Sequence, residues 1–203
     1  MIHRRHMLLG FASAGAAMRV GPCLAQTPSP APDTRLIAAA RSQIGITLTY
    51  DPAYSQLAFP NGDVPRQRGV CTDVLIRAYR DAFGLDLQAL VNRDMHAAFG
   101  AYPRKWGLSH PDSNIDHRRV PNMQVFFARK GMALPLANPA AFVAGDIVTM
   151  VLPGNLPHIG IVSDRLAEGG LHALIHNIGQ GAREEAALGQ FPLTGRYRWL
   201  PAA

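Results

Sequence analysis

Apolar residues recur at helical spacing in the first half of this chain and at strand spacing in the second half. The ranges 33–43, 72–83, 87–99 and 120–130 predict helices. The ranges 46–50, 145–151, 158–162, 173–177 and 194–199 are short and apolar or β-branched, and predict strands. Helices followed by a meander of strands predict an α+β domain, with an antiparallel sheet packed on the helix at 72–83.

The first 25 residues have the pattern of a signal peptide. Arg4 and Arg5 precede a short apolar stretch, and small residues lead to a cleavage point after Ala25. The paired arginines suggest the twin-arginine route, although the general route also fits. We therefore expect an exported protein, periplasmic or secreted, with a flexible lead-in at 26–33 and one domain at 34–203.

The charge of the chain excludes some partners. The formal net charge is +6, and loss of the leader arginines lowers it to about +3, a mild excess that suits an anionic cell envelope. No dense Lys/Arg run with interleaved aromatic residues is present, which argues against nucleic-acid binding. The leader is too short and too weakly apolar to anchor the protein across a membrane. We expect a monomer.

Cys71 is the only cysteine left once the leader is removed, and it opens the helix predicted at 72–83. A lone thiol in an exported protein is a buried spectator, half of an intermolecular disulfide or a nucleophile. Because helix N-termini favour the thiolate, we expect the pKa of Cys71 to be lowered. His158 begins an apolar strand, and we expect its ring to face the Cys71 helix and act as the base.

Other polar residues near Cys71 are candidates for substrate binding. Asp73 lies in the first helical turn, where capping is its ordinary role; we expect it to point away from the thiol and to fix the loop or bind an ammonium group. His117, Arg118 and Arg119 form a basic cluster that is either a solvated surface run or a clamp for carboxylates. His117 has no second histidine at ligand spacing, so we expect no metal. The long loop at 51–69 is expected to border the site.

Several stretches resemble known families. Gly145-Asp146-Ile147-Val148 followed by His158-Ile159-Gly160-Ile161 resembles the strand pair of the NlpC-type, papain-like cell-wall peptidases. The chain more closely resembles an exported bacterial family catalogued as domain of unknown function 1287. The stretches that carry this second resemblance are 49–54, 62–65, 68–73, 115–122, 152–164 and 176–179.

The resemblance to the NlpC-type enzymes implies a papain-like fold and a thiol-hydrolase mechanism, with no cofactor. It implies a third polar residue on the strand after the catalytic histidine, and it favours His176 for that role. Strand alternation by itself does not decide between His176 and Asn177. The resemblance also suggests that Tyr50 lies beside the active site and helps to bind an oxyanion, with the Cys71 N–H as the other donor.

We therefore expect a cysteine peptidase or amidase of the cell envelope that cleaves an amide bond, with peptidoglycan peptides as the substrate implied by resemblance and compartment. Two other functions remain open on the same fold. One is a non-catalytic module that binds envelope peptides, and the other is a hydrolase acting on esters, thioesters or acyl chains.

Overall fold

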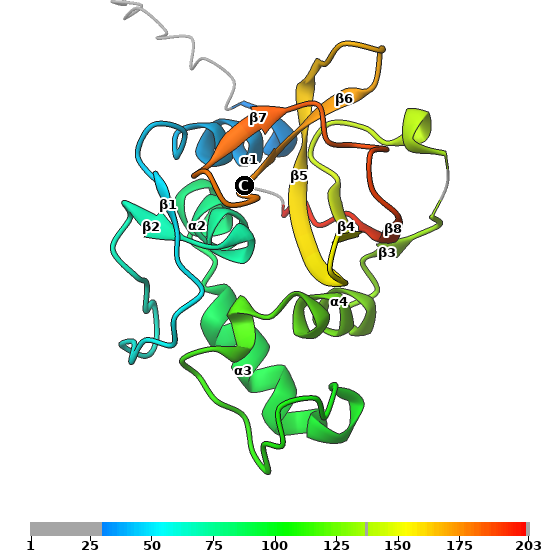
Figure 1. Cartoon of the computed structure of the whole chain (residues 1–203). Coiled ribbons are helices and arrows are strands. Elements are labelled where there is room, and N and C mark those ends of the chain that lie inside the picture. Colours follow the sequence, from blue (N-terminus) through cyan, green and yellow to red (C-terminus); the bar gives the residue numbers. More distant parts are fainter. Residues whose placement is uncertain (1–29, 137, 202–203) are drawn as a thin grey trace, which may run out of the picture.

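The computed structural model describes residues 30–136 and 138–201 as helices on one side of an antiparallel sheet, an α+β arrangement (Figure 1). The predicted signal peptide and most of the lead-in lie outside these residues. The α-helices are α1 (Pro32–Arg41), α2 (Cys71–Phe83), α3 (Leu87–Ala98) and α4 (Val120–Arg129). The strands are β1 (Thr49–Tyr50), β2 (Arg68–Gly69), β3 (Ala133–Leu134), β4 (Ile147–Leu152), β5 (Leu156–Leu166), β6 (His172–His176), β7 (Arg183–Glu185) and β8 (Leu193–Tyr197).

The main sheet has the strand order β3-β8-β4-β5-β6-β7, and all its neighbours are antiparallel. Strands β4 and β5 form a hairpin whose turn contains Gly154 and Asn155, both with positive φ (80° and 60°). Positive φ at both central residues is the geometry of the tight turns that suit twisted hairpins. Strands β1 and β2 pair in parallel as a separate small sheet next to the start of α2.

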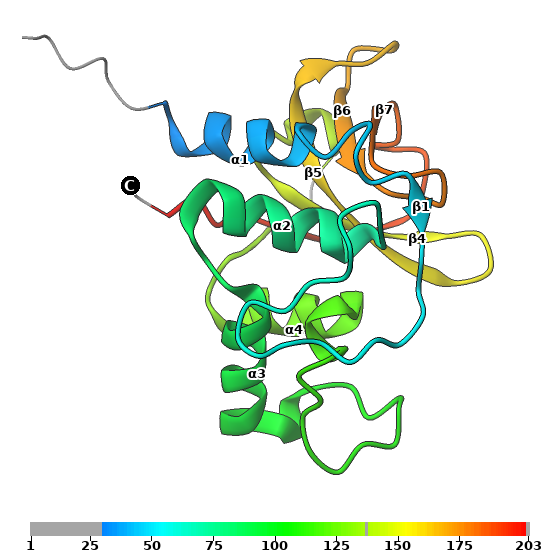
Figure 2. The same ribbon diagram turned by 90° about the vertical axis from the view of Figure 1, so that its left-hand side faces the viewer.

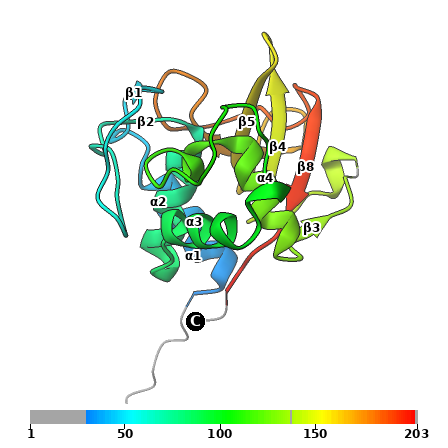
Figure 3. The same ribbon diagram turned by 90° about the horizontal axis from the view of Figure 1, so that it is seen from below.

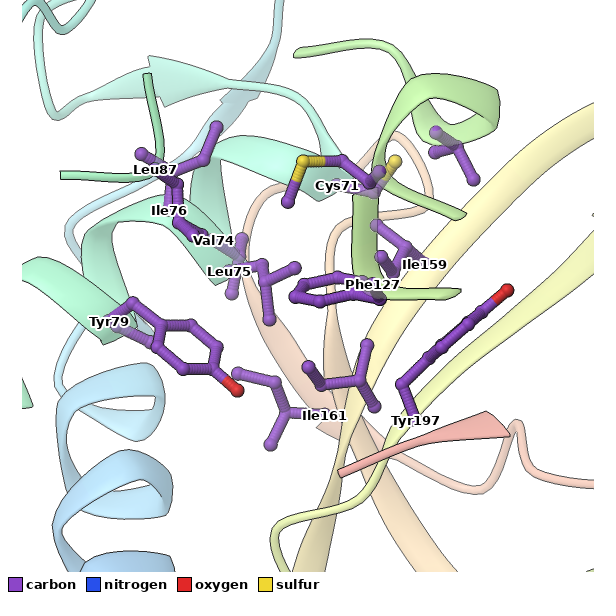
Figure 4. Close-up of a cluster of buried hydrophobic side chains, with 14 of the residues drawn as sticks. Cys71, Val74, Leu75, Ile76, Tyr79, Leu87, Phe127, Ile159, Ile161 and Tyr197 are labelled. Atoms are coloured by element: carbon purple, nitrogen blue, oxygen red, sulfur yellow. The ribbon is translucent and has the colours of Figure 1, made fainter. Parts of the chain in front are cut away.

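The main core lies between the sheet and the helices. Helix α2 buries one apolar face that includes Val74, Leu75 and Tyr79, and it ends at Gly84, which has a left-handed conformation. Ile159 and Ile161 of β5 face this helix (Figure 4). Helices α1 and α2 pack side by side against the sheet (Figure 2), and α3 and α4 lie on the side of α2 away from α1, in front of it when the molecule is seen from below (Figure 3).

A smaller core covers the opposite face of the sheet. Its centre is formed by Val148 and Met150 of β4, Val162 of β5 and Leu174 of β6, over which Phe142 packs. Both faces of the central strands are therefore buried, which explains why their sequences are continuous apolar runs rather than alternating ones.

The predicted helices are confirmed, with ends that differ by about two residues at most. The four predicted strands of the main sheet are confirmed as well. The predicted strand at 46–50 is shorter than expected and covers only Thr49–Tyr50. Strands β2, β3 and β7 were not predicted, because each has only two or three residues and no apolar alternation. In the described part of the chain, no helix has the length and apolar character needed to cross a membrane.

Candidate functional site

The N-terminus of α2 is fixed by a buried ion pair. Val70 is extended and precedes the helix, and its backbone N–H donates to the Asp73 carboxylate at 2.7 Å. Arg118 forms two hydrogen bonds with the same carboxylate, both 2.9 Å long. Arg118 also donates to the backbone carbonyls of Asp51 and Ala53. Asp73 thus caps α2 and, through Arg118, fixes the loop that precedes it, so Cys71 stands at a defined position as the first helical residue.

Cys71 borders a cavity of about 560 Å³ between the 50–54 loop, the start of α2 and the β4–β5 turn. Tyr50, Arg118 and Arg119 line the same cavity, as do Lys105, Trp106 and Pro157. Only 4% of Cys71 is exposed. Of the candidate residues, the structure thus brings Tyr50, Cys71, Arg118 and Arg119 to a single cavity.

The Cys71 thiol is protonated in this arrangement. Burial raises its pKa to about 12, and the nearby Asp73 carboxylate acts in the same direction. The backbone N–H groups of Ile159, Thr72 and Cys71 itself oppose this increase. The expectation of a lowered pKa is therefore wrong for the resting structure. The helix N-terminus does favour the thiolate, but removal of the sulfur from water outweighs it.

Two buried histidines and a carboxylate form a row across β5, β6 and β7. His158 Nε2 lies 2.8 Å from His176 Nδ1, and His176 Nε2 lies 3.1 Å from Glu185 Oε1. Burial lowers the pKa of His158 to about 3, with a further contribution from the charge of His176. Burial also lowers the pKa of His176, although Glu185 opposes that change. Both rings are neutral near pH 7.

Gly160 makes room for this row of side chains. A Cβ atom at Gly160 would lie 2.7 Å from Leu174 Cγ and 3.1 Å from His176 Cβ. Only glycine at this position allows the His176 side chain to pass over β5 and reach His158.

The Cys71 sulfur approaches β5 at Ile159, the neighbour of His158 in the chain. The Ile159 N–H that acts on the Cys71 sulfur belongs to the residue directly after His158. His158 pairs with Met150 of β4, and its side chain projects from β5 on the face opposite that of Ile159. Ile159 packs in the core beside the Cys71 helix, and contact between the His158 ring and the Cys71 sulfur stays a prediction. Within residues 30–136 and 138–201, no hydrogen bond joins Cys71 to either imidazole.

Asn177 and Tyr50 hold different positions around the thiol. The Asn177 amide donates to the carbonyl of Gly69 at 3.0 Å and accepts from the N–H of Gly179. Asn177 therefore ties the end of β6 to the segment before Cys71, whereas His176 contacts His158. Tyr50 is half-buried, and its pKa is raised to about 12 by burial and by the charges of Cys71 and Asp73. Its hydroxyl is thus a hydrogen-bond donor at neutral pH.

The basic cluster divides among three environments. Arg118 is held by Asp73, and Arg119 pairs with Asp116 at 2.8 Å while its guanidinium lies 4.0 Å from the Trp106 ring centroid. His117 is buried away from the cavity, and burial lowers its pKa to about 3. Among the described residues, no group of three or more His, Cys, Asp or Glu side chains is placed to hold a metal ion.

Glu185 was missed by sequence reasoning. It lies on the short strand β7, whose sequence carries no apolar pattern, and nothing in the spacing indicates that β7 pairs with β6. Glu185 pairs with Leu174 and so shares the His176 face of the sheet. Only the register between β6 and β7 reveals its place beside the histidines.

A family comparison and a relative of known sequence both match most of the chain. Residues 37–199 match the family described as Domain of unknown function (DUF1287). The chain is also 54% identical over 162 residues to the protein named "Uncharacterized protein YijF" of Escherichia coli (strain K12), covering 79% of this chain and 78% of that protein. Since the match spans nearly all the residues that form the fold and the site, the chain belongs to the family of domain of unknown function 1287.

Proposed function

We propose that this protein is an exported cysteine hydrolase of papain-like, NlpC-type fold that cleaves an amide bond in peptidoglycan peptides. Cys71 is the nucleophile, His158 is the general base and His176 orients His158. The observation that carries the proposal is the position of Cys71: it opens α2, borders the cavity of about 560 Å³, and lies beside the backbone N–H of the residue next to His158.

The neutral resting state determines how the reaction begins. Both the thiol and His158 are neutral before substrate binds, so proton transfer accompanies attack instead of preceding it. The proposal requires the His158 ring to come into hydrogen-bonding contact with the sulfur, which lies beside the Ile159 N–H of β5, when substrate binds. The Cys71 proton then passes to His158 as the sulfur bonds to the carbonyl carbon.

The remaining steps follow from the groups around the sulfur. The tetrahedral oxyanion accepts hydrogen bonds from the Cys71 N–H and from Tyr50. His158 returns its proton to the leaving amine as the carbon–nitrogen bond breaks, which leaves a thioester. Water then attacks the thioester with His158 again as the base, releasing the carboxylic acid and restoring the thiol.

The charge of the cavity supports an acidic peptide as substrate. Lys105, Arg118 and Arg119 line it, and no acidic residue of the described chain does. Arg118 is already held by Asp73 and Arg119 by Asp116, so Lys105 is the lining cation best placed to meet a substrate carboxylate. Peptidoglycan stem peptides carry such groups, and the predicted leader would deliver the protein to the envelope.

A second candidate function is a module that binds envelope peptides without turnover. It is favoured by the buried thiol, whose pKa is raised to about 12, and by the lack of a hydrogen bond from Cys71 to an imidazole in the described residues. An ester, thioester or acyl hydrolase would use the same cysteine and histidine, and differs only in the bond it cleaves.

Incubation with a muropeptide mixture and with short-chain esters, followed by mass spectrometry, separates the three functions. We expect the wild-type protein to convert muropeptides into fragments that together gain one water, and Cys71→Ala to give none. His158→Gln should lose about 10²–10⁴-fold in rate, whereas His96→Gln, an exposed histidine on α3, should retain full activity.

Three other outcomes would change the proposal. Ester cleavage beside intact muropeptides would replace the amidase proposal with an ester hydrolase. Equal retention of muropeptides by wild type and Cys71→Ala, without products from either, would favour the binding module. Identical products from wild type and Cys71→Ala would reject Cys71 as the nucleophile.

A further inference from the structure

The histidine row ends in a carboxylate that reaches solvent. Glu185 Oε1 lies 3.1 Å from His176 Nε2, and 42% of the Glu185 side chain is exposed, whereas His176 is fully buried. Glu185 also lines a second cavity, of about 180 Å³, together with Ile178, Gln180, Gly181 and Arg183. The chemistry described above assigns no role to Glu185.

The hydrogen-bond chemistry of the row allows a single assignment of protons when both rings are neutral. An ionised carboxylate only accepts, so His176 Nε2 must carry the hydrogen that it donates to Glu185. His176 Nδ1 is then the unprotonated nitrogen and accepts from His158. His158 Nε2 therefore carries a hydrogen, and its Nδ1 is left with a free lone pair.

Neutral rings are the state that the surroundings favour. His158 and His176 are 1% and 0% exposed, and burial disfavours a charged imidazole in both. Glu185 is the only acidic group within hydrogen-bonding distance of either ring among the described residues, and Arg183 is paired with His176 across β6 and β7. If His176 were instead an imidazolium, its Nδ1 would donate to His158 Nε2, and the hydrogen of neutral His158 would lie on Nδ1.

We infer that Glu185 is a positioning residue: its carboxylate fixes the tautomers of His176 and His158, so that His158 presents an unprotonated Nδ1 as the base. The catalytic part of this inference rests on the proposed function, but the assignment of tautomers does not. Glu185 contacts neither the cavity that Cys71 borders nor the reacting atoms, and it acts through His176.

The role of Glu185 in the reaction follows from where the proton moves. The thiol hydrogen passes to His158 Nδ1, which makes His158 an imidazolium with both nitrogens protonated. The Nε2–H of that ring points at His176 Nδ1, and the His176 Nε2–H points at the Glu185 carboxylate, so the negative charge stabilises the imidazolium through one intervening ring. The proton later leaves from Nδ1 to the amine, and the reaction requires no proton transfer to Glu185.

Ring-nitrogen NMR spectra test the inference directly. Two-bond ¹H–¹⁵N correlation spectra of the full-length protein distinguish protonated from unprotonated ring nitrogens. The wild type should show hydrogens on Nε2 of both His158 and His176. Glu185→Ala should lose this pattern, because nothing then requires His176 Nε2 to donate. Glu185→Gln should keep it, since the Gln carbonyl still accepts. Glu168→Gln, an exposed glutamate in the β5–β6 turn, should leave both rings unchanged.

Two results would overturn the inference. The first is a wild-type spectrum with a hydrogen on His158 Nδ1, which would mean that His176 is charged or reversed. The second is a Glu185→Ala spectrum identical to that of the wild type. Because 42% of the Glu185 side chain is exposed and its one side-chain hydrogen bond within the described residues is to His176, both variants are expected to fold.

Kinetics add a readout that separates this inference from the proposed function. We expect Glu185→Ala to lower kcat about 10- to 100-fold with little change in KM, similar to losses seen when outer partners of functional histidines are removed. Glu185→Gln should lie between this variant and the wild type, because it keeps the tautomer and loses the charge. If Glu185→Ala shifts the tautomers but the wild type has no activity, the hydrolase proposal is rejected and the role of Glu185 is retained. If the wild type is active but Glu185→Ala leaves the tautomers unchanged, the role of Glu185 is rejected and the hydrolase proposal is retained.

Discussion

Burial and the helix N-terminus act on the Cys71 thiol in opposite directions, and burial dominates. A preformed thiolate–imidazolium pair would react with alkylating agents well below pH 8 and reach a plateau there. With a pKa raised to about 12, the thiolate fraction keeps increasing throughout the accessible alkaline range. An ordinary thiol has a pKa of about 8.5.

We therefore predict that Cys71 in the substrate-free protein reacts with iodoacetamide more slowly than an ordinary thiol at pH 8, and that its rate still increases tenfold per pH unit between pH 8 and 10. The measurement is the alkylation rate against pH, followed by mass spectrometry, with the urea-unfolded protein as control. A rate that levels off below pH 8 would show a resting ion pair and contradict the neutral start of the reaction.

At the scale of elements, the start of α2 depends on the Asp73–Arg118 pair. The side chains of Asp73 and Arg118 are 4% and 2% exposed. Removal of one partner from a buried pair leaves an uncompensated charge and costs about 3–5 kcal/mol. Asp73 also caps the helix, so its loss releases the segment that positions Cys71.

We predict that Asp73→Asn lowers the free energy of unfolding by about 3 kcal/mol or more, as measured by denaturant titration. Asp81→Asn removes the matched surface pair with Arg66, whose side chains are 31% and 42% exposed, and should change stability by less than about 1 kcal/mol. Equal, small effects of both substitutions would show that the buried pair does not hold the start of α2.

The sequence allowed the elements of the site to be predicted, but not all their contacts. Apolar spacing located α2 and β5, and a lone cysteine beside a helix start indicated the candidate nucleophile. Periodicity could not assign the two faces of β5, because both sides of that strand are buried at its centre and its pattern does not alternate. The partners Glu185 and Arg118 depend on strand register and loop packing, for which local sequence carries no signal.

At the scale of the whole molecule, buried neutral histidines make stability depend on pH. Burial lowers the pKa of both His158 and His117 to about 3, while in the unfolded chain a histidine titrates near 6.5. Between these values the unfolded chain binds protons that the folded protein does not. The stability contributed by each histidine is therefore fully present above pH 6.5 and is lost as pH falls toward 3.

We predict that the free energy of unfolding decreases between pH 7 and pH 5, by about 1.4 kcal/mol per pH unit for each histidine once the pH is below 6.5. Denaturant titrations at the two pH values measure this decrease. His117→Gln removes one buried histidine away from the cavity and should make the decrease smaller. Equal stability of the wild type at pH 7 and pH 5 would contradict the neutral, buried state of these rings.

The central claim, that the Cys71 sulfur bonds to a substrate carbonyl, is tested most directly by intact-protein mass spectrometry of samples acid-quenched during incubation with muropeptides. The account predicts a covalent adduct with the mass of the acyl fragment, located on Cys71 by peptide mapping, released by hydroxylamine and absent from Cys71→Ala. Turnover that proceeds unchanged in Cys71→Ala, or intact muropeptides with no adduct on Cys71, would contradict it.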